Sequence, residues 1–161
     1  MSDALRVAIV HYHLRGGGVT RVIEHALSAA LTKNVKPVVL HGDRDSSSPA
    51  LEHAVAVAGL EYASQESFDD VSGILADMRT AARSKLGAQP DVWHFHNHSL
   101  GKTLIVPRLV QRMSEEGDKL LLQIHDFPED GRPDLYRQLL QGIGSNGSLG
   151  HMLYPRGSHV H

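Results

Sequence analysis

The feature that most constrains the fold is an apolar run that passes through a glycine-rich turn into a helical pattern. The run Val7–Val10 has the length and β-branching of a buried strand. Gly16, Gly17 and Gly18 follow it, and apolar residues then recur at helical spacing. Glycine lets another molecule approach the main chain closely, and the free N–H groups of a helix N-terminus attract anions. This stretch predicts either a site for a phosphate or hydroxyl-rich ligand, or a tight turn that merely needs small residues.

Strand and helix patterns alternate along the rest of the chain. Predicted strands cover residues 6–12, 35–41, 54–62, 91–96 and 119–125, of which 54–62 would also fit a helix. Predicted helices cover residues 19–33, 68–86, 105–116 and 134–141, and residues 142–161 are predicted to be loop. Such alternation produces βαβ units and a parallel sheet. We expect one α/β domain over residues 1–161, a Rossmann-like parallel sheet flanked by helices, with strand order 3-2-1-4-5.

Composition excludes several classes of protein. The 161 residues carry a formal net charge of −2, which does not indicate a nucleic-acid or membrane surface. Cysteine is absent, so disulfides and thiolate chemistry are excluded. No apolar run is long enough to form a transmembrane segment and the N-terminus has no signal-peptide core, so we expect a cytoplasmic protein. The unusual number is 12 histidines, whose positions say more than their count.

Three polar segments follow strands that should end at the same edge of the sheet. His11 and His13 precede the glycine turn, the segment His94–His98 ends the fourth strand, and His125 with Asp126 ends the fifth. Ligands of open parallel sheets bind outside the carboxyl ends of the strands. We therefore expect one ligand site at this edge, with Arg15 and Arg21 adding positive charge beside the glycines.

The chemistry of that edge fits more than one function. His94, His96 and His98 alternate and would share a face if the strand persists, so they could bind a metal ion. His13, His125 and Asp126 could complete the shell, which would indicate a metal-dependent hydrolase. No cysteine and no His-Glu-x-x-His motif accompanies them, and we expect no bound metal.

Two other interpretations use the same groups. Imidazole, carboxylate and amide side chains offer paired donors and acceptors to the vicinal hydroxyls of a sugar. A dinucleotide site is the other interpretation, in which Asp43 would contact a ribose. The spacing of Gly16–Gly18 does not fit the Gly-x-Gly-x-x-Gly pattern, however.

Three stretches carry a resemblance to a known family. They are Arg6–Val10 with Gly16–Arg21, the strand Asp91–His96, and the segment Gln123–Pro133. They are spread over residues 6–133, most of the length of the chain, which resembles the N-terminal half of family 4 glycosyltransferases. These are retaining enzymes with two facing Rossmann-like domains, the GT-B fold.

The resemblance implies a function and a set of site residues. The domain would bind the acceptor, and a nucleotide-sugar, held by a C-terminal domain with a Glu-x7-Glu motif, would donate the sugar. The glycine turn would lie beside the donor phosphates and the acceptor, and His125 by the transferred sugar. We take His125 and Asp126 as catalytic residues. The residues expected to bind substrate are Gly16, Gly17, Gly18, Arg21, His13, His96 and His98.

No C-terminal nucleotide-sugar domain is recognisable in the sequence. We expect a truncated chain that lacks transferase activity by itself, has no cofactor, and depends on the missing domain or on a partner chain. A stand-alone module that binds a sugar or a phosphate is the non-enzymatic alternative.

Overall fold

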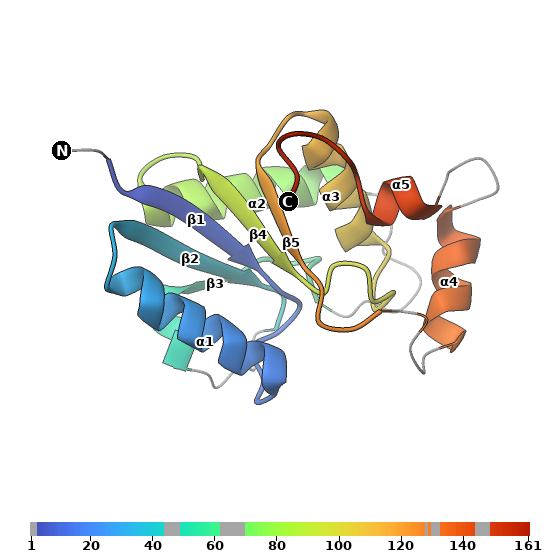
Figure 1. Cartoon of the computed structure of the whole chain (residues 1–161), viewed down its shortest axis with the longest axis horizontal. Coiled ribbons are helices and arrows are strands. Elements are labelled where there is room, and N and C mark those ends of the chain that lie inside the picture. Colours follow the sequence, from blue (N-terminus) through green and yellow to red (C-terminus); the bar gives the residue numbers. More distant parts are fainter. Residues whose placement is uncertain (1–2, 44–48, 62–69, 128, 130–132, 144–148) are drawn as a thin grey trace.

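Five parallel strands form one sheet in the order β3-β2-β1-β4-β5, so the predicted α/β, Rossmann-like topology is confirmed (Figure 1). The computed structural model describes residues 3–43, 49–61, 70–127, 129, 133–143 and 149–161. The strands are β1 (Leu5–Val10), β2 (Val35–His41), β3 (Ala54–Ala56), β4 (Val92–His96) and β5 (Leu120–Gln123). The helices are α1 (Gly18–Leu31), η1 (Pro49–His53), α2 (Val71–Leu86), α3 (Ile105–Glu115), α4 (Pro133–Ile143) and α5 (Leu149–Leu153).

Both faces of the sheet are covered by helices, α1 on one side and α2 with α3 on the other. Alternation along β1 divides the core accordingly. Ala8 and Val10 pack in the cluster of α2 and α3, whereas Ile9 packs with Ile23 and Leu27 of α1. Because both faces of a central parallel strand are buried, β1 is apolar without interruption from Val7 to Val10, which is the pattern seen in the sequence.

The longest helix begins and ends at residues that favour those positions. The Asp70 carboxylate accepts a hydrogen bond from the Gly73 N–H at 2.7 Å and caps α2. Gly87 ends the helix in the left-handed region, with φ of 83°. The predicted helix began at residue 68, and its first two positions lie outside the described residues.

The prediction that residues 142–161 form only a loop is wrong. They contain α5, and the chain after it returns to the open edge of β5. Leu120 N–H donates to the His159 carbonyl at 2.8 Å, and His161 N–H donates to the Leu120 carbonyl at 2.9 Å. An edge strand presents unpaired N–H and C=O groups that an extended segment can bind. This pairing joins residues about forty positions apart, so local patterns do not indicate it.

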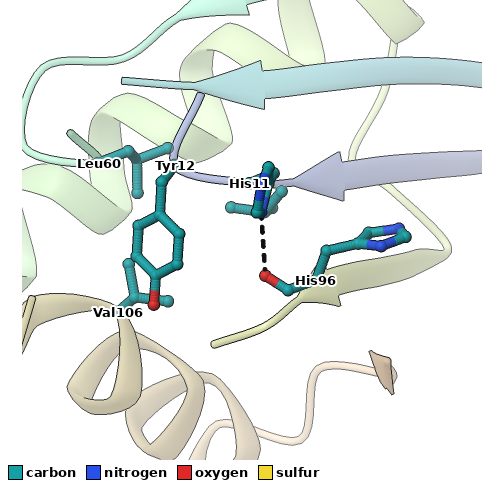
Figure 2. A pocket seen from close by; sticks show the side chains of 6 residues that line it. His11, Tyr12, Leu60, His96 and Val106 are labelled. Carbon is teal, nitrogen blue, oxygen red and sulfur yellow. Dashed lines mark hydrogen bonds between the residues drawn. The ribbon is translucent and has the colours of Figure 1, made fainter. Parts of the chain in front are cut away.

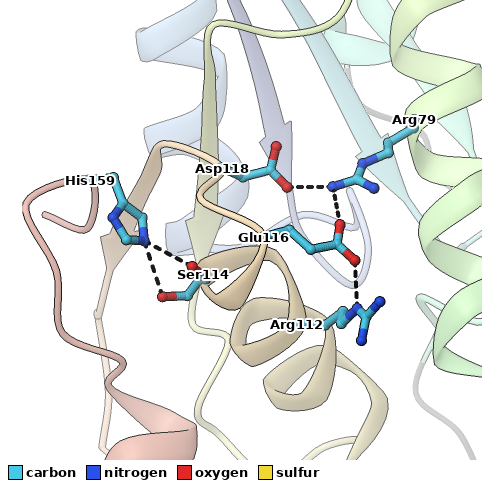
Figure 3. A network of polar contacts seen from close by, with 6 residues as sticks. All are labelled: Arg79, Arg112, Ser114, Glu116, Asp118 and His159. Atoms are coloured by element: carbon cyan, nitrogen blue, oxygen red, sulfur yellow. Dashed lines mark hydrogen bonds and ion pairs between the residues drawn. The ribbon is translucent and has the colours of Figure 1, made fainter.

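An ion-pair network joins α2 to the turn between α3 and β5 (Figure 3). Arg79 donates to Glu116 at 2.7 Å and to Asp118 at 2.5 Å, and Arg112 donates to the same Glu116 at 2.5 Å. The pKa of Glu116 is lowered, first by its bond to Arg79 and then by Arg112. The network lies away from the carboxyl ends of the strands and supports the packing of α2 beside α3.

No helix in the described part of the chain is both long and apolar enough to cross a bilayer.

Leu109→Ala should lower the free energy of unfolding by about 2–5 kcal/mol, because Leu109 is fully buried and the change leaves a cavity. Leu31→Ala removes the same atoms from a side chain that is 54% exposed, and should change stability by less than about 0.5 kcal/mol. Urea denaturation of both variants measures the difference. Equal losses would show that α3 does not pack as described.

Candidate functional site

The carboxyl ends of β1, β4 and β5 meet at one edge of the sheet and bring their histidines together. His11 follows β1, and its Nδ1 donates to the main-chain oxygen of His96 at 3.2 Å (Figure 2). Both side chains are buried. Burial lowers the pKa of His11 to about 4 and that of His96 to about 3, so both imidazoles are neutral at neutral pH.

The crevice between these residues is small. It is lined by Val10, His11, Tyr12, Leu60, His96 and Val106, which leave no space for a water molecule between them. Ligand pockets usually hold about 300 Å³ or more. The phenol of Tyr12 lies beside the end of β4 and donates to the carbonyl of Asn97 at 3.0 Å. The crevice is therefore part of the packing beneath the edge.

His125 and Asp126 reach this edge from the end of β5. His125 Nε2 lies 2.9 Å from His96 Nδ1, and the two rings are nearly parallel, with an interplanar angle of 14° and centroids 5.2 Å apart. Asp126 accepts a hydrogen bond from the Asn97 amide at 3.1 Å. His125 is half-buried and Asp126 is exposed, so the two side chains predicted to be catalytic lie at the surface. The structure thus brings His96, His125 and Asp126 together.

His94 and His96 lie together, with ring centroids 4.3 Å apart, but His98 does not share their face because the strand does not persist to it. β4 ends at His96, and Asn97 has a left-handed backbone with φ of 53°, which redirects the chain. His94 Nε2 donates to the Gln123 side chain at 2.9 Å on the sheet surface. His98 has no exposed surface, and its Nε2 donates to the Leu153 carbonyl of α5 at 2.5 Å. In this conformation His98 holds α5 and offers no surface to a ligand.

The three glycines of the turn are exposed and are not required by the fold. A Cβ added at Gly16 or Gly18 would meet nothing within 4 Å, and one at Gly17 would meet only the Arg15 carbonyl at 3.9 Å. Gly17 precedes α1 with φ of 172°, which is extended backbone open to any residue. The structure therefore gives no steric or conformational reason for glycine at these three positions.

Two contacts hold the turn in place. Arg15 forms an ion pair with Asp43 at the end of β2, and the Thr20 hydroxyl donates to the Arg15 carbonyl at 2.6 Å. This ion pair occupies the carboxylate that the dinucleotide interpretation assigned to a ribose. Arg21 is exposed on the first turn of α1, and His13 is half-buried beside the turn. Burial, and then the charge of Arg15, lower the pKa of His13.

Metal binding gains no support from this geometry. Among the residues that the structure describes, no group of three or more His, Cys, Asp or Glu side chains is arranged to hold an ion. His94 and His98 are turned toward Gln123 and Leu153 instead of toward a common centre.

The residue that sequence reasoning missed is Asn97. It is buried and bonded both to the turn after β5 and, through its carbonyl, to Tyr12. An available signal was its position between two histidines where a strand ends, because asparagine adopts the left-handed conformation more readily than most residues.

The free energy of unfolding should fall as the pH drops from 6.5 toward 4. His98 binds a proton with a pKa near 6.5 when unfolded and near 4 when folded, because burial disfavours its charge. The unfolded state therefore binds more protons in this window, and stability rises with pH by up to about 3 kcal/mol for this group. His98→Gln can still donate to Leu153 but does not titrate.

Urea denaturation at pH 5 and pH 7 should show a smaller difference in stability for His98→Gln than for the unsubstituted chain. His25→Gln, on the exposed side of α1, controls for the loss of one histidine. An unchanged pH dependence in His98→Gln would contradict the burial of this imidazole.

Comparisons with known proteins indicate a glycosyltransferase relationship. The chain is similar to the mannosylglucosyl-3-phosphoglycerate synthase of Petrotoga mobilis, with 24% identity over 163 residues. The alignment covers 91% of this chain, and the chain spans 30% of the length of that synthase. No family model matches the chain, and no solved structure matches it significantly. The similarity supports a relationship to glycosyltransferases at the level of the general class of enzyme.

Proposed function

We propose that this chain is the acceptor-binding domain of a retaining glycosyltransferase with GT-B architecture, which transfers a sugar from a nucleotide-sugar. The observation that carries the proposal is the glycine turn. Its three glycines are exposed at the carboxyl edge of the sheet although the fold does not require them. Bare main chain at the start of a 14-residue helix suits an anionic or hydroxyl-rich ligand. The similarity to a synthase of a glycosylated phosphoglycerate points the same way.

Each predicted site residue receives a role that fits its exposure. Gly16–Gly18 and Arg21 contact the acceptor and lie beside the donor phosphates, and His13 borders them. His125 contacts the transferred sugar, and Asp126 shapes the turn that presents it. His96 and His98 are buried, so we assign them supporting contacts beneath the ligand.

The acceptor that we favour carries a phosphate. The name of the Petrotoga relative contains a phosphoglycerate, and the turn combines N–H groups of a helix N-terminus with Arg21. The departing diphosphate of the donor needs preorganised charge, which is supplied in the whole enzyme by a second domain. A metal-dependent hydrolase is not favoured, because no metal-binding group is found among the described residues.

Gly17→Val should weaken binding of 3-phosphoglycerate and of inorganic phosphate by about tenfold or more, equal to about 1.4 kcal/mol. Valine fits the extended backbone at this position, so the fold should remain intact while the added side chain blocks close approach. Isothermal titration calorimetry measures the affinity.

Ala29→Val is the matched control, because it adds bulk to an exposed position at the far end of α1. Its affinity should equal that of the unsubstituted chain. Unchanged affinity in a folded Gly17→Val variant would remove the glycine turn from the proposed site.

The 161-residue chain should show no sugar transfer and no donor hydrolysis with a panel of nucleotide-sugars. After His125 the sequence contains no pair of glutamates at Glu-x7-Glu spacing to engage a donor. Removing one hydrogen-bond donor that stabilises the charge of the transition state typically raises the activation free energy by about 3 kcal/mol. A chain without the whole diphosphate-binding site should therefore show no detectable turnover.

His125→Ala distinguishes true turnover from contamination, since a contaminating enzyme would be indifferent to it. Turnover that His125→Ala abolishes would mean that the chain itself is a complete enzyme. Phosphate binding without any activity, even after a nucleotide-sugar domain is supplied, would favour a stand-alone binding module.

A further inference from the structure

Asn97, which has no part in the proposed binding of acceptor and donor, holds the turn after β5. Its side-chain oxygen accepts the N–H of His125 at 2.7 Å and the N–H of Asp126 at 3.2 Å. Its side-chain nitrogen donates to the Asp126 carboxylate at 3.1 Å. One buried amide thus bonds to the main chain of both proposed site residues and to one of their side chains.

The backbone of Asn97 is in a conformation that needs this setting. It has φ of 53°, and no other non-glycine residue in the described part of the chain has a positive φ. Its N–H donates to the Gln123 carbonyl at 2.9 Å, and its carbonyl accepts the Tyr12 hydroxyl. Backbone held in a sparsely populated region by surrounding contacts is common at functional sites. These contacts aim the Asn97 side chain at the turn.

The ring of His125 is held by His96, the residue that precedes Asn97 in the chain. The 2.9 Å bond between His96 Nδ1 and His125 Nε2 requires one ring to donate and the other to accept. His96 Nε2 is buried and has no hydrogen-bond partner among the residues that the structure describes. A buried N–H without a partner is rarer than a lone pair without one, so the proton of His96 belongs on Nδ1.

The position of the proton on the His96 ring determines which nitrogen of the His125 ring is protonated. With His96 Nδ1 as donor, His125 Nε2 is the acceptor, and a neutral His125 carries its proton on Nδ1. Burial keeps His96 neutral by lowering its pKa to about 3. His125 then offers Nδ1–H as the single donor of its ring.

We infer that His96 and Asn97 are positioning residues for His125 and Asp126. Asn97 holds the backbone of the turn, and His96 holds the His125 ring in the Nδ1–H tautomer, as a hydrogen-bond donor for the hydroxyl-rich ligand. The inference rests on the proposed function for the ligand, whereas the geometry of the turn can be tested without one.

Nuclear magnetic resonance of the full chain with ¹⁵N-labelled histidine tests the tautomer. Long-range proton–nitrogen correlations at pH 7.5 should show His125 protonated on Nδ1, with its signals assigned by their loss in His125→Gln. His96→Phe removes the donor and should shift His125 to a mixture of tautomers. His96→Asn places an amide N–H near the position of Nδ1 and should restore the original tautomer. A His125 that carries its proton on Nε2 in the unsubstituted chain would overturn the inference without any variant.

Hydrogen exchange tests the backbone contact. Asn97→Gly suits the left-handed φ while it removes the side chain, so it separates the lost contact from backbone strain. The amides of His125 and Asp126 should exchange about tenfold faster, as expected for a lost hydrogen bond worth about 1.4 kcal/mol. Amides of the central strand β1 should be unchanged. Unchanged exchange at His125 and Asp126 in the folded variant would overturn the role of Asn97.

The outcomes separate this inference from the proposed function. An Nδ1–H tautomer in a chain that binds neither 3-phosphoglycerate nor phosphate would leave the positioning role intact and overturn the acceptor site. Binding of those two probes by a chain whose His125 carries its proton on Nε2 would support the acceptor site and overturn the positioning role of His96.

Discussion

The structure depends on β1 being paired on both edges and buried on both faces. Its register runs from Leu5 with Val35 on one side to Val10 with Phe95 on the other. Alternate residues of β1 fill two separate cores, one under α1 and one under α2 and α3. From Val7 to Val10 this strand carries only apolar side chains, and the polar residues that follow Val10 lie at the carboxyl edge. That is where His11 and His13 are found.

The histidines at this edge are mostly structural, although their number suggests metal chemistry. His11, His94 and His98 each donate to an oxygen acceptor, on His96, Gln123 and Leu153 respectively. Burial lowers the pKa of each of them, so they act as neutral donors. Neutral imidazoles can line a buried edge without uncompensated charge. His125 and Asp126, by contrast, keep exposed surface at this edge.

The glycine turn and the turn after β5 are built in opposite ways. The glycine turn has open space around each glycine, and its contacts to the fold run through the neighbouring Arg15 and Thr20. The turn after β5 is bonded to a buried asparagine through its own main chain. One turn is thus exposed for contact with a ligand, and the other is held rigidly from beneath. The proposed acceptor site would use both turns, because a reacting sugar must be oriented by groups that do not move.

The sequence by itself determined the strand order, because apolar runs alternating with amphipathic helices admit few topologies and right-handed crossovers select among them. It also placed Gly16–Gly18, His96 and His125 at one edge, since parallel strands end together. Only the tertiary structure decided which polar groups are used up in packing. Asn97 ends β4 and redirects His98 into the interior, and Arg15 engages Asp43. The last residues pair with β5, about forty positions away, so no local pattern encodes them. Periodicity reports which face a residue occupies, whereas hydrogen bonds between distant segments depend on the assembled fold.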